Sequence, residues 1–133
     1  MDCATLHDKI EETVKSGKPK MYFDLLGTEN LRCWLNVYMP GEGTAGLHYH
    51  LSDETFTVIE GSGEIVHRDG IRTKIEKGSV VLISAKTYYD IKNTGDSVLA
   101  VLGNRAEAFG GATIYLDPEL DEKMKGRKQF DRI

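Results

Sequence analysis

The residues best suited to chemistry lie close together, where His48 and His50 precede Glu54. Alternate side chains of a strand point to the same face, so the two imidazoles should converge on one point. Ser52 and Asp53 are turn formers, and an antiparallel return of the chain would bring Glu54 beside the histidines. Two histidines and one carboxylate form a facial triad that binds a divalent metal and leaves coordination positions open. The spacing therefore predicts a metal site, with Fe, Mn, Zn or Ni as the candidate ions.

Short strands must position these side chains. From residue 31 to 39, apolar residues alternate with polar or aromatic ones, which is typical of a strand with two different faces. Further short strands follow, separated by turns such as Asp69-Gly70. This pattern predicts an all-β sandwich or barrel with its core at about residues 20–116. The further strands are expected at 47–50, 54–60, 63–68, 71–76, 79–83, 88–93, 98–104 and 112–116.

Each end of the chain has a different pattern. Three apolar residues spaced four apart predict an N-terminal helix over about residues 4–16. Near the other end, Asp117 is a suitable N-cap and Pro118 suits the first helical position. A short helix over residues 118–125 is expected there, within a helical tail of residues 117–133.

The stretch from residue 34 to 103 resembles the cupin family in two motifs. The first motif has glycine, His-x-His, glutamate and a further glycine, and the second begins with glycine and ends with asparagine. The positions that match the two motifs are His48, His50, Glu54, Gly61, Gly78 and Asn93. The resemblance implies a jelly-roll β-barrel that forms a single domain over residues 1–133. It also implies a homodimer, because small cupins commonly pair through their sheets.

Four positions depart from the family pattern. Glu42 stands where the first motif usually begins with glycine, Ser84 replaces the usual proline and Lys86 replaces the usual glycine. Tyr89 occupies the place of the histidine that is the fourth metal ligand in the family. The resemblance therefore implies the fold more directly than the activity.

Tyr89 has three interpretations from the sequence. It is a metal ligand as a phenolate, since a bound cation favours deprotonated ligands. Alternatively its hydroxyl acts near the metal as a proton donor or acid–base group, as Glu54 could. In the third interpretation it only fills the space of the missing histidine. The alternation of the strand favours an inward ring, because the reverse would expose Ile91 and bury Lys92.

Composition excludes several classes of protein. The chain has 17 Lys and Arg against 21 Asp and Glu, a net charge of -4, which argues against a nucleic-acid binder. The two cysteines do not make a disulfide framework and suit a reducing compartment. No apolar signal core opens the sequence, and no apolar run approaches the ~20 residues of a membrane span. A cytoplasmic location without membrane contact is expected.

Two functions remain open. The first is a metal-dependent enzyme that acts on a small molecule inside the barrel, as a dioxygenase, isomerase, lyase or cyclase. The metal would polarise a substrate oxygen or activate O₂ or water. The alternative is a non-catalytic module that binds a small molecule or sugar beside a weakened metal site, which the missing fourth ligand would suit. Fold alone does not choose between them.

Overall fold

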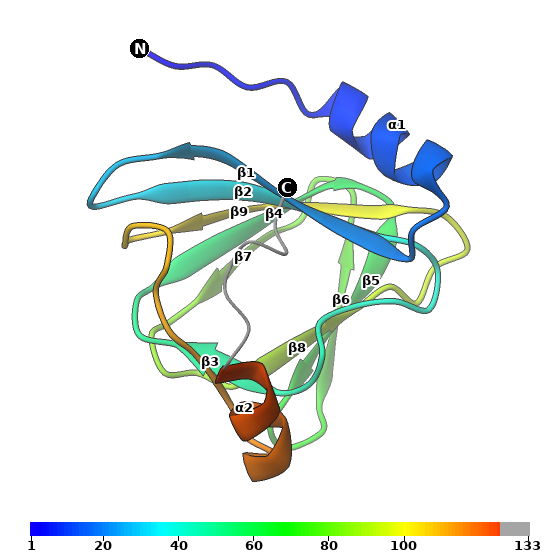
Figure 1. The fold of residues 1–133 in the computed structure, drawn as a ribbon. Helices are drawn as coiled ribbons and strands as arrows, with labels where there is room; N and C mark the ends of the chain where they lie inside the picture. The colour runs from blue at the N-terminus through cyan, green and yellow to red at the C-terminus, as the bar shows by residue number, and fades with distance from the viewer. Residues whose placement is uncertain (126–133) are drawn as a thin grey trace.

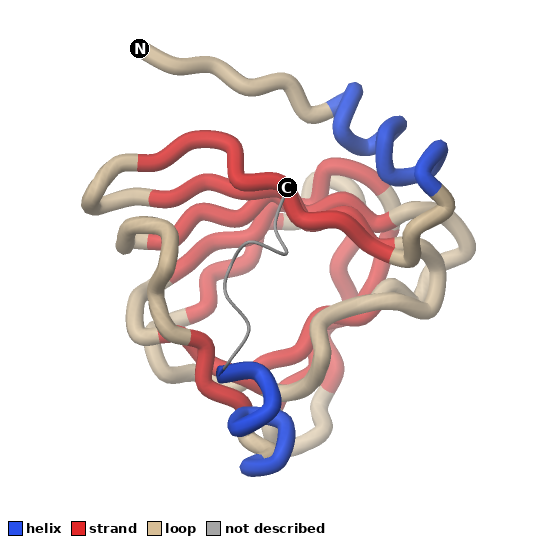
Figure 2. The backbone as a smooth tube through the Cα atoms, viewed as in Figure 1, coloured by secondary structure: helices blue, strands red, loops and turns tan. Residues whose placement is uncertain are grey.

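Two five-stranded antiparallel sheets face each other in a computed structural model that describes residues 1–125 (Figures 1 and 2). A helix, α1 (His7–Ser16), precedes the strands and a second, α2 (Pro118–Lys125), follows them. The strands are β1 (Lys20–Gly27), β2 (Arg32–Tyr38), β3 (His48–His50), β4 (Glu54–Glu60), β5 (Ser62–His67), β6 (Arg72–Glu76), β7 (Val80–Ile83), β8 (Tyr89–Lys92), β9 (Leu99–Arg105) and β10 (Thr113–Tyr115). This architecture confirms the predicted all-β jelly-roll barrel with a short helix at each end.

The sheets interleave segments that lie far apart in the sequence. One sheet has the strand order β1-β2-β9-β4-β7, and the other has the order β10-β3-β8-β5-β6. Strands β3 and β4, which are consecutive along the chain, therefore lie in opposite sheets. This crossing brings the chemistry-bearing residues of β3, β4, β8 and β9 around one interior space.

Most predicted elements are confirmed, with small shifts at their ends. The N-terminal helix begins at His7 rather than near residue 4, and α2 has the predicted bounds 118–125. Strand β1 falls within the expected barrel core of residues 20–116, although the sequence does not predict it as a separate strand. It pairs along its length with β2. The predicted helical tail beyond residue 125 lies outside the described residues.

Strand β2 turns its polar face toward the barrel interior. Its apolar residues Leu35 and Val37 point outward and are fully buried in a cluster with Ile10 of α1 and Met21 of β1. Figure 1 shows α1 lying across this side of the first sheet. The alternate residues of β2, among them Trp34, therefore face the interior. Neither helix of the described chain has the length and apolar character needed to cross a membrane.

Two turns next to the strands use left-handed backbone conformations. Gly61, a residue of the first motif, has a φ of 82°, and a Cβ there would lie 2.1 Å from the carbonyl oxygen of Val98. Lys86 has a φ of 62° although it carries a side chain, and it stands where the second motif has glycine. Its backbone N–H donates to the carbonyl oxygen of His50 at 2.7 Å. The loop before β8 is thus tied directly to the strand that carries the two histidines.

Candidate functional site

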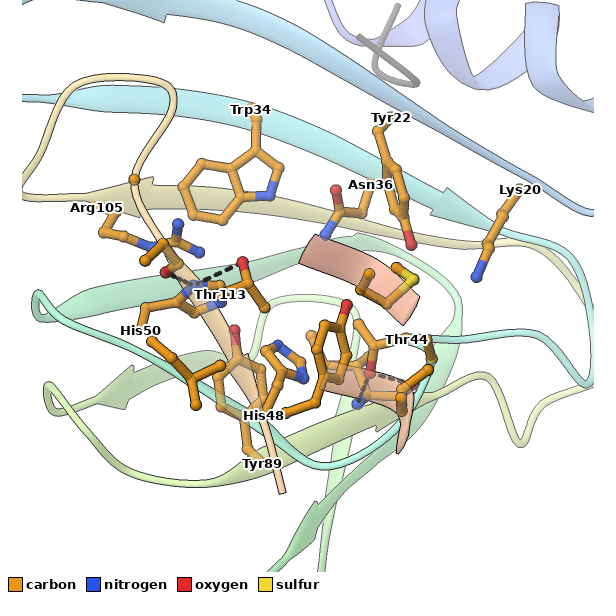
Figure 3. Close-up of a pocket in the computed structure, with 18 of the residues that line it drawn as sticks. Lys20, Tyr22, Trp34, Asn36, Thr44, His48, His50, Tyr89, Arg105 and Thr113 are labelled. Atoms are coloured by element: carbon orange, nitrogen blue, oxygen red, sulfur yellow. Dashed lines mark hydrogen bonds between the residues drawn. The ribbon is translucent and has the colours of Figure 1, made fainter. Parts of the chain in front are cut away.

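A pocket of about 1420 Å³ opens between the inner faces of the two sheets. Figure 3 shows its side chains converging from both sides. Trp34 of β2 lies on one wall, whereas His48 of β3 and Tyr89 of β8 lie on the opposite wall. His50 and Arg105 also line this space. The pocket therefore holds both predicted histidines and the predicted tyrosine.

The two histidines share one face of β3, as their spacing predicted. Their ring centroids lie 5.0 Å apart, and the side chains are 4% and 6% exposed. Nδ1 of His48 lies 2.8 Å from the carbonyl oxygen of Gly46, and Nδ1 of His50 lies 3.3 Å from that of Ala112. Because a carbonyl oxygen only accepts, both contacts favour the tautomer with the proton on Nδ1, and Oγ1 of Thr113 lies 3.4 Å from the same atom of His50. Each Nε2 is consequently left with a free lone pair.

Both imidazoles are neutral at physiological pH. Burial is the main cause that lowers the pKa of His48 from 6.5 to about 4, against the raising effect of its hydrogen bond to Gly46. Burial lowers the pKa of His50 to about 2, and the positive charge of Arg105 and the neighbouring His48 act in the same direction. Neutral imidazole is the form that donates its lone pair to a metal or accepts a proton from a substrate.

Glu54 opens β4 and is bound by Arg105, a residue that the sequence did not single out. Oε2 of Glu54 accepts hydrogen bonds from Nε of Arg105 at 2.9 Å and from its Nη2 at 2.8 Å. Both side chains are 2% exposed, and the two residues lie directly opposite each other on neighbouring strands. Burial raises the pKa of Glu54, while the charge of Arg105 acts in the opposite direction.

Tyr89 joins this ion pair through its hydroxyl group, which hydrogen-bonds to Glu54 and to Arg105. Its ring lies 4.4 Å from that of His48 and is 2% exposed. Burial, followed by the charge of Glu54, raises the pKa of Tyr89 well above 10. The tyrosine is therefore a neutral phenol, held between the carboxylate and the histidine pair. Its ring faces inward, as the alternation of the strand predicted.

The donors fit the expected divalent metal only in part. The histidine pair is suited to binding a divalent metal, because metal-binding histidines usually donate their other ring N–H to a backbone carbonyl or carboxylate. The carboxylate of Glu54 is instead engaged by Arg105. Over residues 1–125, no three His, Cys, Asp or Glu side chains gather as a metal-binding group. The structure thus brings His48 and His50 together as two donors, with Glu54 and Tyr89 linked beside them by Arg105.

Arg105 was missed for a definable reason. The predicted strand ended one residue earlier, at residue 104, and a lone arginine after a strand carries no motif. The register between β4 and β9 places Arg105 opposite Glu54, and only the folded sheet shows that pairing. Two aromatic rings lie beside the ion pair: Trp34 meets Phe56 edge to face with ring centroids 5.7 Å apart, and the guanidinium carbon of Arg105 lies 4.7 Å from the Trp34 ring centroid.

Comparison with known proteins agrees with this architecture. The sequence profile of the cupin domain matches residues 34–103, more than half of the chain. No curated protein matches the chain in sequence. Similar solved structures include an uncharacterised conserved protein with a double-stranded β-helix domain from Klebsiella pneumoniae. That protein is 22% identical with a TM-score of 0.67, over 78% of this chain and 92% of its own.

Two further structural neighbours carry the names of enzymes. The DMSP lyase DddQ from Ruegeria pomeroyi is 16% identical with a TM-score of 0.65, over 76% of this chain and 53% of its own. A sugar phosphate isomerase from Silicibacter pomeroyi is 21% identical with a TM-score of 0.59, over 68% of this chain and 59% of its own. At these identities the likeness shows the shared fold. Together with the matching profile and the two interleaved sheets, it identifies the chain as a member of the cupin family.

Proposed function

We propose that this cupin is a small-molecule enzyme whose reaction centre is the floor of the pocket, with a divalent metal bound by His48 and His50. One observation carries the proposal. Both histidines are buried and neutral, and both use Nδ1 as a donor to a backbone carbonyl, so their free lone pairs are on Nε2. Such a prearranged pair is costly to bury without a partner and is well suited to ligand binding.

The metal would supply Lewis acidity toward a substrate oxygen or an activated water. The remaining groups are suited to moving a proton. The hydroxyl of Tyr89 holds its proton at neutral pH and hydrogen-bonds to Glu54. It can donate to a substrate oxygen while Glu54 and Arg105 balance the resulting charge. Arg105 holds Oε2 of Glu54, so Glu54 would serve as a third metal ligand through Oε1 or after release from Arg105.

Among dioxygenases, isomerases, lyases and cyclases, this arrangement of residues favours an isomerase or a lyase. Both involve proton transfer, for which the Tyr89 hydroxyl and the Glu54 carboxylate are placed together. The structural neighbours named as a lyase and as a sugar phosphate isomerase show that this fold accommodates both classes. Dioxygenase and cyclase chemistry receive less support from these residues.

The alternative function is a non-catalytic small-molecule or sugar-binding module with a weakened metal site. The ion pair between Glu54 and Arg105 favours it, because a paired carboxylate is a poorer ligand. The tyrosine in place of the fourth histidine favours it as well. A binding module would hold a ligand in the pocket and leave it unchanged.

The chain offers a matched experiment, because it also has a solvent-exposed histidine. We propose to reconstitute the wild type and the variants His50→Ala and His7→Ala with zinc, manganese, nickel or anaerobic iron(II). Metal content is then measured by mass spectrometry. The side chain of His7 is 83% exposed and lies in α1, so His7→Ala should keep the metal. His50→Ala should lose it while circular dichroism shows an intact barrel, whereas unchanged metal content in His50→Ala would refute the assignment.

A homodimer and a cytoplasmic location complete the proposal. The outer face of the edge strand β7 supports a contact between copies, since Val80 and Leu82 are 68% and 69% exposed there. An exposed edge strand with apolar side chains offers a surface on which a second chain can pair. Light scattering coupled to size exclusion measures the mass in solution, and a monomeric mass would remove the dimer from the proposal.

A further inference from the structure

The inner face of β1 and β2 carries polar groups that have no role in the histidine centre. Within residues 1–125, Oδ1 of Asn36 and the hydroxyl oxygen of Tyr38 are buried without a well-formed hydrogen bond, and Tyr22 is near enough to the Tyr38 hydroxyl to raise its pKa. Asn36 and Tyr38 are 6% and 0% exposed, and both line the pocket. A buried polar atom without a partner is unfavourable, so native proteins rarely keep one without a reason.

These atoms belong to a polar strip formed by Lys20, Tyr22, Asn36 and Tyr38. Lys20 pairs with Tyr38 and Tyr22 with Asn36 in the register of β1 and β2, so all four residues lie on one face. Figure 3 shows Lys20, Tyr22 and Asn36 pointing into the pocket from the wall opposite His48. A ligand bound beside the histidines therefore has the polar strip on its other side.

The unpaired atoms indicate the chemistry of that side of the ligand. An amide oxygen such as Oδ1 of Asn36 only accepts hydrogen bonds, and a tyrosine hydroxyl both donates and accepts. An alcohol group can serve both, because it has one donor and two acceptor positions. Hydrocarbon would leave both atoms unsatisfied. The polar strip is therefore suited to a ligand that carries hydroxyl groups.

The positive charge of the pocket lining indicates a second property of the ligand, a negative charge. Lys18 and Lys20 on one side and Lys123 of α2 line the pocket, and none has an acidic partner within residues 1–125. Asp121 is the one acidic residue of the described lining, and it pairs with Lys125 at 3.6 Å. The whole chain has a net charge of -4, so the positive lining is local. A cleft lined by one sign of charge concentrates ligands of the opposite sign.

We propose that the pocket binds a small polyhydroxylated anion, with its hydroxyl groups on Asn36 and Tyr38 and its anionic group near Lys18, Lys20 and Lys123. The anionic group is a carboxylate or a phosphate ester, since lysines bind both. The inference deepens the proposed function by naming its substrate class, and it rests on that function only in using the same pocket. Binding of such an anion is independent of whether the histidines hold a metal.

Six-carbon probes separate the two properties. Gluconate has hydroxyls and a carboxylate, sorbitol 6-phosphate has hydroxyls and a phosphate, sorbitol has hydroxyls alone and hexanoate has a carboxylate alone. Calorimetric titration should show gluconate or sorbitol 6-phosphate binding at least about tenfold more tightly than sorbitol and hexanoate, and the tighter of the two identifies the anionic group. Equal binding of hexanoate would overturn the hydroxyl site, and equal binding of sorbitol would overturn the role of charge. Binding of none of the four would overturn the whole proposal.

Variants then locate the binding. Asn36→Leu and Tyr38→Phe remove the unpaired atoms with little change in volume, and each should weaken the preferred anion about fivefold or more. Their midpoints of unfolding should be unchanged or higher, which a purely structural role would not produce. Lys20→Gln should weaken binding as well, whereas Lys15→Gln, at the exposed end of α1 and outside the pocket lining, should not. Unchanged affinity in all three pocket variants would overturn the assignment.

The titrations are run on metal-free and on metal-loaded protein. Anion binding without metal uptake would refute the metal centre and support the anion site. Metal uptake without anion binding would refute the anion site and support the metal centre. The failure of one proposal is thus distinguishable from the failure of the other.

Discussion

Arg105 binds Glu54 with two hydrogen bonds to a single carboxylate oxygen, at 2.9 and 2.8 Å, in the interior of the barrel. Nη1 of Arg105 also lies 3.4 Å from Oε1 of Glu107. The cation therefore balances two carboxylates, one of which stands at the glutamate position of the family motif. Any metal that recruits Glu54 must compete with this guanidinium group.

Arg105→Met should raise metal affinity about tenfold or more, because it frees the carboxylate of Glu54. The substitution leaves a buried carboxylate unpaired and should lower the free energy of unfolding by about 3–5 kcal/mol. Calorimetric titration with zinc measures the affinity, and the double variant Glu54→Gln/Arg105→Met serves as the control. If the single variant gains no more affinity than the double variant, Glu54 is not a metal ligand.

Substitutions of Tyr89 separate its three interpretations. Tyr89→Phe keeps the ring and should leave zinc affinity within about twofold, since the hydroxyl group is bonded to Glu54 and Arg105. A fall of more than about tenfold would instead indicate a phenolate ligand. Tyr89→His should tighten zinc binding by supplying the fourth histidine of the family pattern. Loss of turnover in Tyr89→Phe at unchanged metal content would support the proton donor over the space-filling interpretation.

Stability should fall in weak acid because of the buried histidines. The pKa of His48 is about 4 in the folded protein and 6.5 as its ordinary value, so the unfolded chain takes up the proton first. The free energy of unfolding should therefore decrease as the pH falls from about 6.5 to 4, by about 3 kcal/mol for His48. Urea denaturation in the presence of a chelator measures this dependence.

The control for the acid dependence is His48→Asn, whose amide can still donate to Gly46. Its stability should decline less steeply over the same range. Glu54, whose pKa is raised, acts in the opposite direction in both proteins and cancels in the comparison. Identical slopes for the two proteins would show that His48 does not titrate in this way.

Lys86→Gly should stabilise the protein by about 0.5–1 kcal/mol. Lys86 has a φ of 62°, a left-handed conformation that costs a side-chain-bearing residue about 1 kcal/mol relative to glycine. Lys86→Ala removes the long side chain without relieving the backbone, so it should give no such gain. Thermal unfolding of the three proteins makes the comparison, and equal stabilisation by alanine would exclude a backbone origin.

The sequence predicted the fold well because periodicity and turn residues act locally. The alternation over residues 31–39 identified a strand, yet it did not say which face points inward. The polar and aromatic face of β2 lies inside because α1 covers the apolar face, and that choice depends on tertiary packing. His48, His50 and Tyr89 could be placed on common faces from the alternation of strand residues. Arg105 and Asn36 belong to no motif, so their roles emerge only from the sheet register and from unsatisfied buried atoms.

The most direct test of the histidine centre is the X-ray absorption spectrum of the zinc-reconstituted protein. Zinc held by His48 and His50 should show a shell of nitrogen and oxygen ligands at about 2.0–2.1 Å, with the scattering of two imidazoles and without sulfur. A protein that retains no zinc, or a zinc shell that lacks imidazole, would contradict metal binding by the two histidines.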